Sequence, residues 1–84
     1  MNKRKLLEKL LSGSKNIRFS EAVKCAETFG FRLMRIKGSH HIYTHPQVQE
    51  LINLQDDNGQ AKPYQIKQLL KIIEQYDLKM EDSE

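Results

Sequence analysis

Residues 31–46 read Phe31-Arg32-Leu33-Met34-Arg35-Ile36-Lys37-Gly38-Ser39-His40-His41-Ile42-Tyr43-Thr44-His45-Pro46, and this stretch decides the fold. Two runs with an extended pattern, 31–37 and 40–45, flank a Gly-Ser pair. Glycine accepts backbone angles that other residues avoid, so the pair predicts a tight turn between two antiparallel strands. Pro46 has no N–H to donate to a strand ladder and therefore marks the end of the second strand.

The remaining elements are predicted from spacing outward from this hairpin. Leucines at helical period predict a short helix over about 2–11. Ser20, as an N-cap, predicts a second helix that runs to about residue 29. A third strand is expected at 50–54, and Pro63 fits the first turn of a last helix. The order helix, helix, strand, strand, strand, helix predicts an α+β fold, in which a three-stranded antiparallel sheet carries helices on one face and leaves the other face open.

Length and composition indicate one small domain over residues 1–84. A chain of 84 residues buries only about 60–65% of its unfolded surface, so the core is limited. No run of about 18 apolar residues is present, so no membrane span is expected. The single cysteine, Cys25, excludes an internal disulfide, is expected in the core, and makes a cytoplasmic location the default.

Charge is distributed unevenly along the chain. The net charge is +3, but residues 79–84 are acidic, and the rest holds 13 basic residues against 8 acidic ones. A basic body favours a polyanion partner, although ordinary surface charge for solubility explains the balance equally well. The acidic segment 77–84 is expected to fray.

All three histidines lie within the ten residues 37–46, and histidine is the side chain that exchanges protons near neutral pH. Metal binding is the first reading to weigh. Side chains alternate along a strand, so only His41 and His45 share a face, and four residues of strand rise put them about 13 Å apart. That separation is too large for one ion, so neither a metal nor another cofactor is expected.

The same stretch carries the groups that RNA cleavage without a metal needs. A histidine, His41 or His40, can remove the proton of a ribose hydroxyl. Charge on the phosphate can be stabilised by side chains and backbone N–H groups nearby. These are Arg35, Lys37, Gly38, Ser39 and, at the start of the last helix, Lys62. Tyr43, expected beside His41 on the open face, can stack a base. The alternative interpretation is that the histidines are strand-surface residues that cluster by chance, and His45 is interpreted as a strand-end residue rather than a catalyst.

The motif Phe29-Gly30-Phe31, the run from Arg35 to Tyr43, and His45-Pro46 resemble the HicA toxin family over roughly residues 19–76. The resemblance implies a fold like the double-stranded RNA-binding domain, metal-independent cleavage of mRNA by a type II toxin, and inhibition by a HicB-like antitoxin. The family's essential histidine falls in the Gly-Ser-x-His region, which maps to His41, or to His40 if the first of the pair operates.

The chain departs from the family pattern in two places. Residues 1–18 add an N-terminal helix and linker. Lys62-Pro63-Tyr64 stands where many members have a Val/Ile-Pro-x-His segment and a Gly-Thr-Leu helix start. The hypothesis from sequence is therefore an RNA-cleaving toxin. The alternatives are a non-catalytic RNA-binding module and a protein that acts only by docking a partner.

Overall fold

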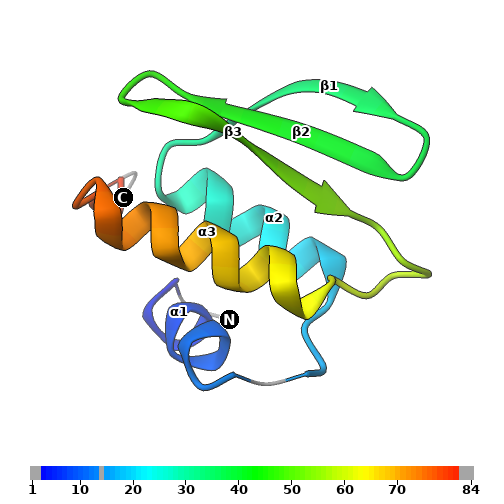
Figure 1. Cartoon of the computed structure of the whole chain (residues 1–84). Helices are drawn as coiled ribbons and strands as arrows, with labels where there is room; N and C mark the ends of the chain where they lie inside the picture. Colours follow the sequence, from blue (N-terminus) through cyan, green and yellow to red (C-terminus); the bar gives the residue numbers. More distant parts are fainter. Residues whose placement is uncertain (1–2, 14, 82–84) are drawn as a thin grey trace.

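The computed structural model of the protein describes residues 3–13 and 15–81. The elements of this part of the chain are α1 (Lys3–Leu11), α2 (Phe19–Thr28), β1 (Arg32–Lys37), β2 (His40–His45), β3 (Val48–Gln55) and α3 (Pro63–Gln75). The strands form one antiparallel sheet in the order β1-β2-β3, and the helices lie on one side of it (Figure 1). The predicted α+β fold and its element order are confirmed.

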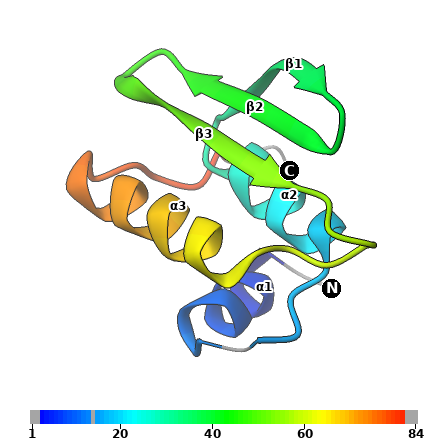
Figure 2. The same cartoon turned by 45° about the vertical axis from the view of Figure 1, so that its right-hand side comes forward.

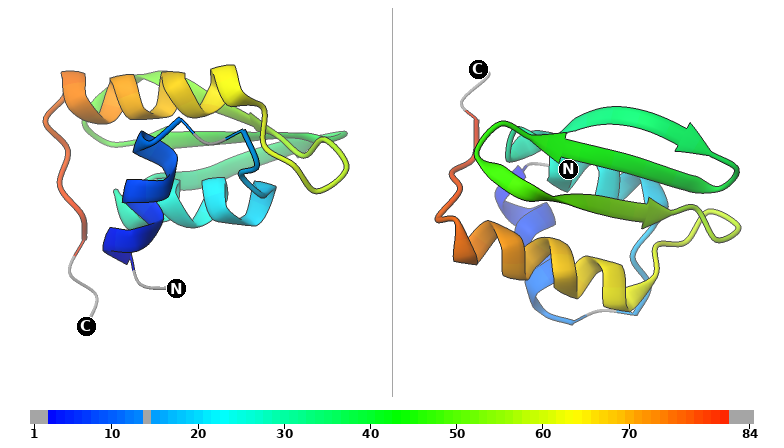
Figure 3. Two further views of the ribbon diagram at one scale, coloured as in Figure 1. Left: turned by 90° about the horizontal axis from the view of Figure 1, so that it is seen from below. Right: turned by 45° about the horizontal axis from the view of Figure 1, so that its top comes forward.

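The helices are arranged in two layers beneath the sheet. Helices α2 and α3 lie directly against it, and α1 lies on their far side (Figures 1 and 2). The view from below shows α1 in front of α2, with its C-terminal end toward α3 (Figure 3, left). Leu6 and Leu10 are each only 2% exposed, while Leu11 is 62% exposed. The leucine stripe therefore buries α1 against the helical layer, as its spacing predicts.

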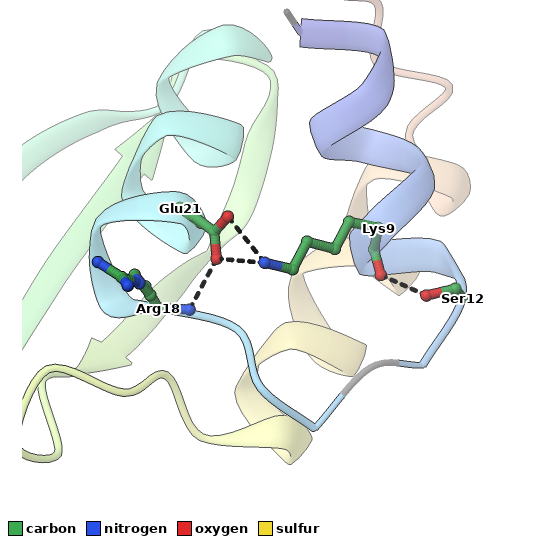
Figure 4. A network of polar contacts seen from close by, with 4 residues as sticks. All are labelled: Lys9, Ser12, Arg18 and Glu21. Atoms are coloured by element: carbon green, nitrogen blue, oxygen red, sulfur yellow. Dashed lines mark hydrogen bonds and ion pairs between the residues drawn. The ribbon is translucent and has the colours of Figure 1, made fainter. Parts of the chain in front are cut away.

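The start of α2 differs from the prediction in a detail that ties α1 to it. The N-cap is Arg18 rather than Ser20, which lies inside the helix. The backbone N–H of Arg18 donates to Glu21 Oε1 at 2.9 Å. Lys9 Nζ of α1 reaches both carboxylate oxygens of Glu21 at 3.0 Å (Figure 4). The hydrogen bond from Arg18, helped by the Lys9 charge, lowers the pKa of the Glu21 carboxyl.

The hydrophobic core fills the space between the sheet and the two helices beneath it and continues between these helices and α1. Its most buried large side chains come from β3, α1, α3 and the segment before β1, and each is at most 2% exposed: Phe31, Leu10, Ile52, Leu54 and Leu69. Cys25 is also buried, and burial raises the pKa of its thiol to about 11. The prediction that Cys25 is a core residue is confirmed by this burial, since its side chain is only 2% exposed.

The chain after α3 folds back against the end of α2. Leu78 is 7% exposed and joins the core, and the N–H of Glu81 donates to the carbonyl of Thr28 at 2.7 Å. The expectation that the chain frays from about residue 77 is therefore wrong for residues 77–81. Residues 82–84, the rest of the expected acidic tail, lie outside the described residues.

Candidate active site

The turn between β1 and β2 is fixed by Gly38. Its φ is +60°, and of the two turn residues Gly38 alone has a positive φ. Glycine at the first central position is the pattern of a type II′ turn, whose twist matches a hairpin. The carbonyl of Ser39 accepts the N–H of Asp56 at 2.9 Å, so the tip of the hairpin is also held to the end of β3. The turn therefore presents the following histidines from a fixed base.

His41 has one ring nitrogen anchored and the other available. Its Nδ1 lies 3.3 Å from the carbonyl oxygen of Ser39. Because a carbonyl only accepts, Nδ1 carries the proton in this contact, and Nε2 of the neutral ring keeps its lone pair. The ring of Phe19, at the start of α2, lies 4.7 Å from the His41 ring between centroids. His41 is half-buried on the helix side of the sheet and can accept a proton at Nε2.

His40 lies on the opposite, open face with the same arrangement of its ring. Its Nδ1 is 3.2 Å from Oδ1 of Asn53, so Nδ1 donates and Nε2 keeps its lone pair. Lys37 stands directly opposite His40 across the ladder, and Arg35 stands opposite Ile42. Directly opposite residues share a face, so the open face brings His40 together with both cations and separates them from His41.

Tyr43 does not take the role predicted from sequence. It shares a face with His41, as alternation requires, but that face is covered by the helices. Tyr43 is only 2% exposed, and burial, together with the charge of Glu27, raises the pKa of its hydroxyl. The expectation that Tyr43 stacks an RNA base is therefore wrong. The expectation that His41 lies on the open face is wrong for the same reason, because His41 shares the face of Tyr43.

Lys62 lies at the N-cap of α3 and forms an ion pair with Asp57 at 3.4 Å. The loop that carries it is fastened to the segment before α2. The N–H of Phe19 donates to the carbonyl of Gly59 at 2.9 Å, and the N–H of Ala61 donates to that of Ile17 at 2.9 Å. The structure therefore places Lys62 in the loop that holds Phe19, the residue against His41, and not with the cations of the open face.

His45, at the far end of β2, uses both of its ring nitrogens. Nε2 donates to the carbonyl of Phe29 at 3.0 Å, and Nδ1 accepts the N–H of Gln47 at 3.0 Å. The residue is 9% exposed. A hollow of about 640 Å³ lies beside it, lined by residues that include Arg32, Asp77 and Glu81. With no free lone pair, His45 is a structural residue, in line with its interpretation as a strand-end residue.

Sequence reasoning missed two residues that position the histidines. Phe19 directly precedes the predicted N-cap Ser20, and Asn53 lies in the predicted third strand, but neither was predicted to contact a histidine. No local signal marks Phe19, because its contact with His41 joins residues from different elements. Asn53 does have a weak signal in the sequence, since a polar amide between Ile52 and Leu54 predicts a side chain on the open face beside β2.

In residues 3–13 and 15–81, no group of three or more His, Cys, Asp or Glu side chains is placed to hold a metal ion. None of the helices in the same part of the chain is both long enough and apolar enough to span a membrane.

The fold and site define a small α+β protein that presents two histidines from a Gly-Ser turn at the rim of a basic sheet. Comparison with known families gives the class a name. The family described as the HicA toxin of bacterial toxin–antitoxin systems matches residues 19–75. The chain therefore belongs to the HicA toxin family, as its sequence predicts. No curated protein matches the chain.

Proposed function

We propose that this toxin is an endoribonuclease that cleaves mRNA without a metal ion and uses His41 as its general base. The observation that carries the proposal is the anchored ring of His41, whose Nδ1–H donates to Ser39 and whose Nε2 keeps its lone pair at the rim of the sheet. Nε2 takes the proton of a ribose 2′-hydroxyl, and the 2′-oxygen attacks the adjacent phosphorus. The bond to the 5′-oxygen breaks, that oxygen takes up a proton from water, and a 2′,3′-cyclic phosphate remains, after which His41 releases its proton to solvent.

We assign the stabilisation of the charge that builds on the phosphate to groups of the turn and of the neighbouring loop. The N–H groups of Gly38 and Ser39, the Ser39 hydroxyl and the ammonium of Lys62 are the donors we propose. Lys62 exchanges its exposed Asp57 partner for the phosphate, which costs little because ion pairs at the surface are weak.

His40 is assigned a different part from His41. Neighbouring strand residues point to opposite faces, so the two rings cannot both act on one phosphodiester. His40 shares its face with Arg35 and Lys37, and we assign these three to holding the RNA backbone. Loss of the general base therefore lowers kcat, whereas loss of His40 raises KM.

The experiment incubates the purified chain with end-labelled RNA in EDTA. We expect fragments that end in a 2′,3′-cyclic phosphate. His41→Ala should lower the rate by about 10²–10⁴-fold, the usual share of a general base. His40→Ala, the matched control from the next position, should keep kcat within a few fold and raise KM. Turnover that survives His41→Ala and disappears with His40→Ala would transfer the catalytic role to His40.

Other outcomes separate the remaining readings. Cleavage that needs a divalent ion, or that survives both substitutions, contradicts the mechanism. Salt-sensitive RNA binding without cleavage indicates a non-catalytic RNA-binding module. The antitoxin that the family implies is proposed to be HicB-like, and action on mRNA places the toxin in the cytoplasm. Co-expression with such a partner should restore growth that the toxin alone arrests.

A further inference from the structure

The two edge strands of the sheet differ in how far other elements cover them. At the β3 edge, the side chain of Gln65 from α3 accepts the N–H of Gln55 at 2.7 Å, and the hydroxyl of Tyr76 donates to Glu50 at 2.6 Å. At the other edge, all six residues of β1 are exposed. The views show β1 along the margin of the sheet, with α3 on the side of β3 (Figure 1; Figure 3, right). An open edge displays backbone N–H and C=O groups that a further strand can pair with.

A β-bulge sorts the side chains of β1 by chemistry. Leu33 stands opposite Tyr43 and Arg35 opposite Ile42, so Met34 is the extra residue. Without the bulge, strict alternation would put Arg35 on the helix side. With it, Arg35 and Lys37 fall on the open face, and Leu33 and Ile36 fall on the helix side, where they are 46% and 56% exposed. Arg32, at the start of β1, instead lies 3.8 Å from Glu81 and lines the hollow beside His45.

We propose that β1 docks an extended strand of a partner protein, in which acidic residues on the open face alternate with apolar residues on the helix side. Pairing of the main chains would extend the sheet by one strand. Carboxylates would face Arg35 and Lys37, and apolar side chains would cover Leu33 and Ile36. This pattern has the period of two that any strand has, so one short segment meets both requirements.

Two other occupants fit β1 less well. A second copy of this chain, paired edge to edge, would line up Arg35 and Lys37 of both copies on one face, and like charges across a ladder destabilise it. RNA would engage the cations but leave Leu33, Met34 and Ile36 exposed, and β1 has no aromatic ring on which a base could stack. An acidic, half-apolar strand uses both faces of β1.

Docking here also bears on the site, and this step rests on the proposed function. Arg35 and Lys37 belong to the cationic face that we assign to the RNA backbone. A strand whose carboxylates occupy them would compete with RNA, so the partner would act as an inhibitor that mimics the charge of the phosphate backbone.

The test measures binding of a short fluorescent peptide in which valine and glutamate alternate. The full chain should bind it, and hydrogen exchange should slow at residues 32–37. The same peptide with every backbone nitrogen methylated should not bind, because neither of its edges can then donate hydrogen bonds. Equal binding of the methylated peptide would overturn strand pairing. No RNA is present, so the result does not depend on cleavage.

Substitutions test the two faces separately. Ile36→Glu should weaken binding about tenfold through the apolar face. The pair Arg35→Glu and Lys37→Glu should reverse the preference, toward a peptide in which valine and lysine alternate. Lys71→Glu, an exposed lysine on α3, is the matched control and should leave affinity unchanged. If Lys71→Glu lowers the peptide affinity as much as the β1 substitutions do, then the loss reflects net charge and not contacts of β1.

The alternative occupants have outcomes of their own. If the chain sediments as a dimer, and Ile36→Glu converts it to a monomer, then β1 pairs with a second copy of the chain. If RNA slows hydrogen exchange at the amides of residues 32–37 and the valine–glutamate peptide does not bind, then β1 is a nucleic-acid contact. Either result overturns the proposal.

Discussion

The two ends of β2 carry the same residue type in opposite settings. At the hairpin end, His41 donates from Nδ1 to Ser39 and keeps the lone pair of Nε2. At the other end, His45 donates from Nε2 to Phe29 and accepts at Nδ1 from Gln47. One ring is half-buried with a nitrogen to spare, and the other is buried with none. The hydrogen bonds, and not the residue type, separate a candidate base from a structural residue.

Helix α2 touches both ends of this comparison. Its first residue, Phe19, contacts the His41 ring, and Phe29, at its C-cap, offers the carbonyl that His45 binds. The ring of Phe31 also lies 5.0 Å from that of His45, edge to face. The helix therefore sets the spacing between the two ends of β2. A substitution at one end should leave the contacts of the histidine at the other end unchanged.

The largest effect on stability is expected at the buried end. His45→Ala leaves the carbonyl of Phe29 without its donor and opens a gap beside Phe31. We expect a loss of about 2–3 kcal/mol in the free energy of unfolding, equivalent to a fall in Tm of roughly 10–20 °C. Thermal unfolding followed by circular dichroism measures it.

The control for His45 is His45→Gln, whose amide nitrogen can still donate to the Phe29 carbonyl. It should recover part of the lost stability. Both variants should keep cleavage per folded molecule at low temperature. A variant that folds fully and has lost cleavage would remove the distinction between the two ends of β2.

The next effect concerns the ring that supports His41. Phe19→Ala removes a contact of the kind that contributes about 0.5–1.5 kcal/mol. We expect cleavage to fall by roughly 3–10-fold through kcat, because the imidazole is held less firmly. Phe19→Leu, which keeps most of the apolar volume, should fall less. If both variants lose stability equally and kcat does not change, then Phe19 is only a packing residue.

A comparison of two glycines isolates the turn that positions His41. Gly38 has φ +60° and Gly13 has φ +79°, and a Cβ at either position would meet nothing within 4 Å. Alanine at each should therefore cost about 1–2 kcal/mol of stability from the backbone alone. Only Gly38→Ala should also lower cleavage, because only this turn carries the histidines. Equal cleavage in the two variants at matched folded fraction would contradict the role given to the turn.

The sequence predicted the elements better than the orientation of the sheet. Alternation correctly put His41, Tyr43 and His45 on one face. It did not say which face the helices cover, because β2 places one large apolar residue on each side, Ile42 and Tyr43. The bulge at Met34 could not be predicted from the sequence either, since it exists only in the pairing of β1 with β2. The anchored tautomers depend on contacts across the fold, with Asn53 for one ring and Phe29 for another.

The smallest expected effect is dependent on pH and touches only the His41 end of α2. Glu21 accepts the Arg18 N–H and pairs with Lys9, so the pKa of its carboxyl is lowered in the folded chain. A carboxyl with a lowered folded pKa contributes stability above its unfolded value, near 4.5, and loses it as pH falls through the folded value.

Glu21→Gln should therefore cost about 1 kcal/mol or less at pH 7. The difference from the parent chain should shrink steadily below the ordinary pKa of 4.5. Urea unfolding at a series of pH values measures this, and Lys9→Met in a double-mutant cycle separates the ion pair from the Arg18 contact. Because Glu21 lies two residues from Phe19 and far along α2 from Phe29, hydrogen exchange should quicken near Phe19 and stay unchanged near His45. Equal quickening at both ends would mean that α2 loosens as a unit and that the two histidine settings are not independent.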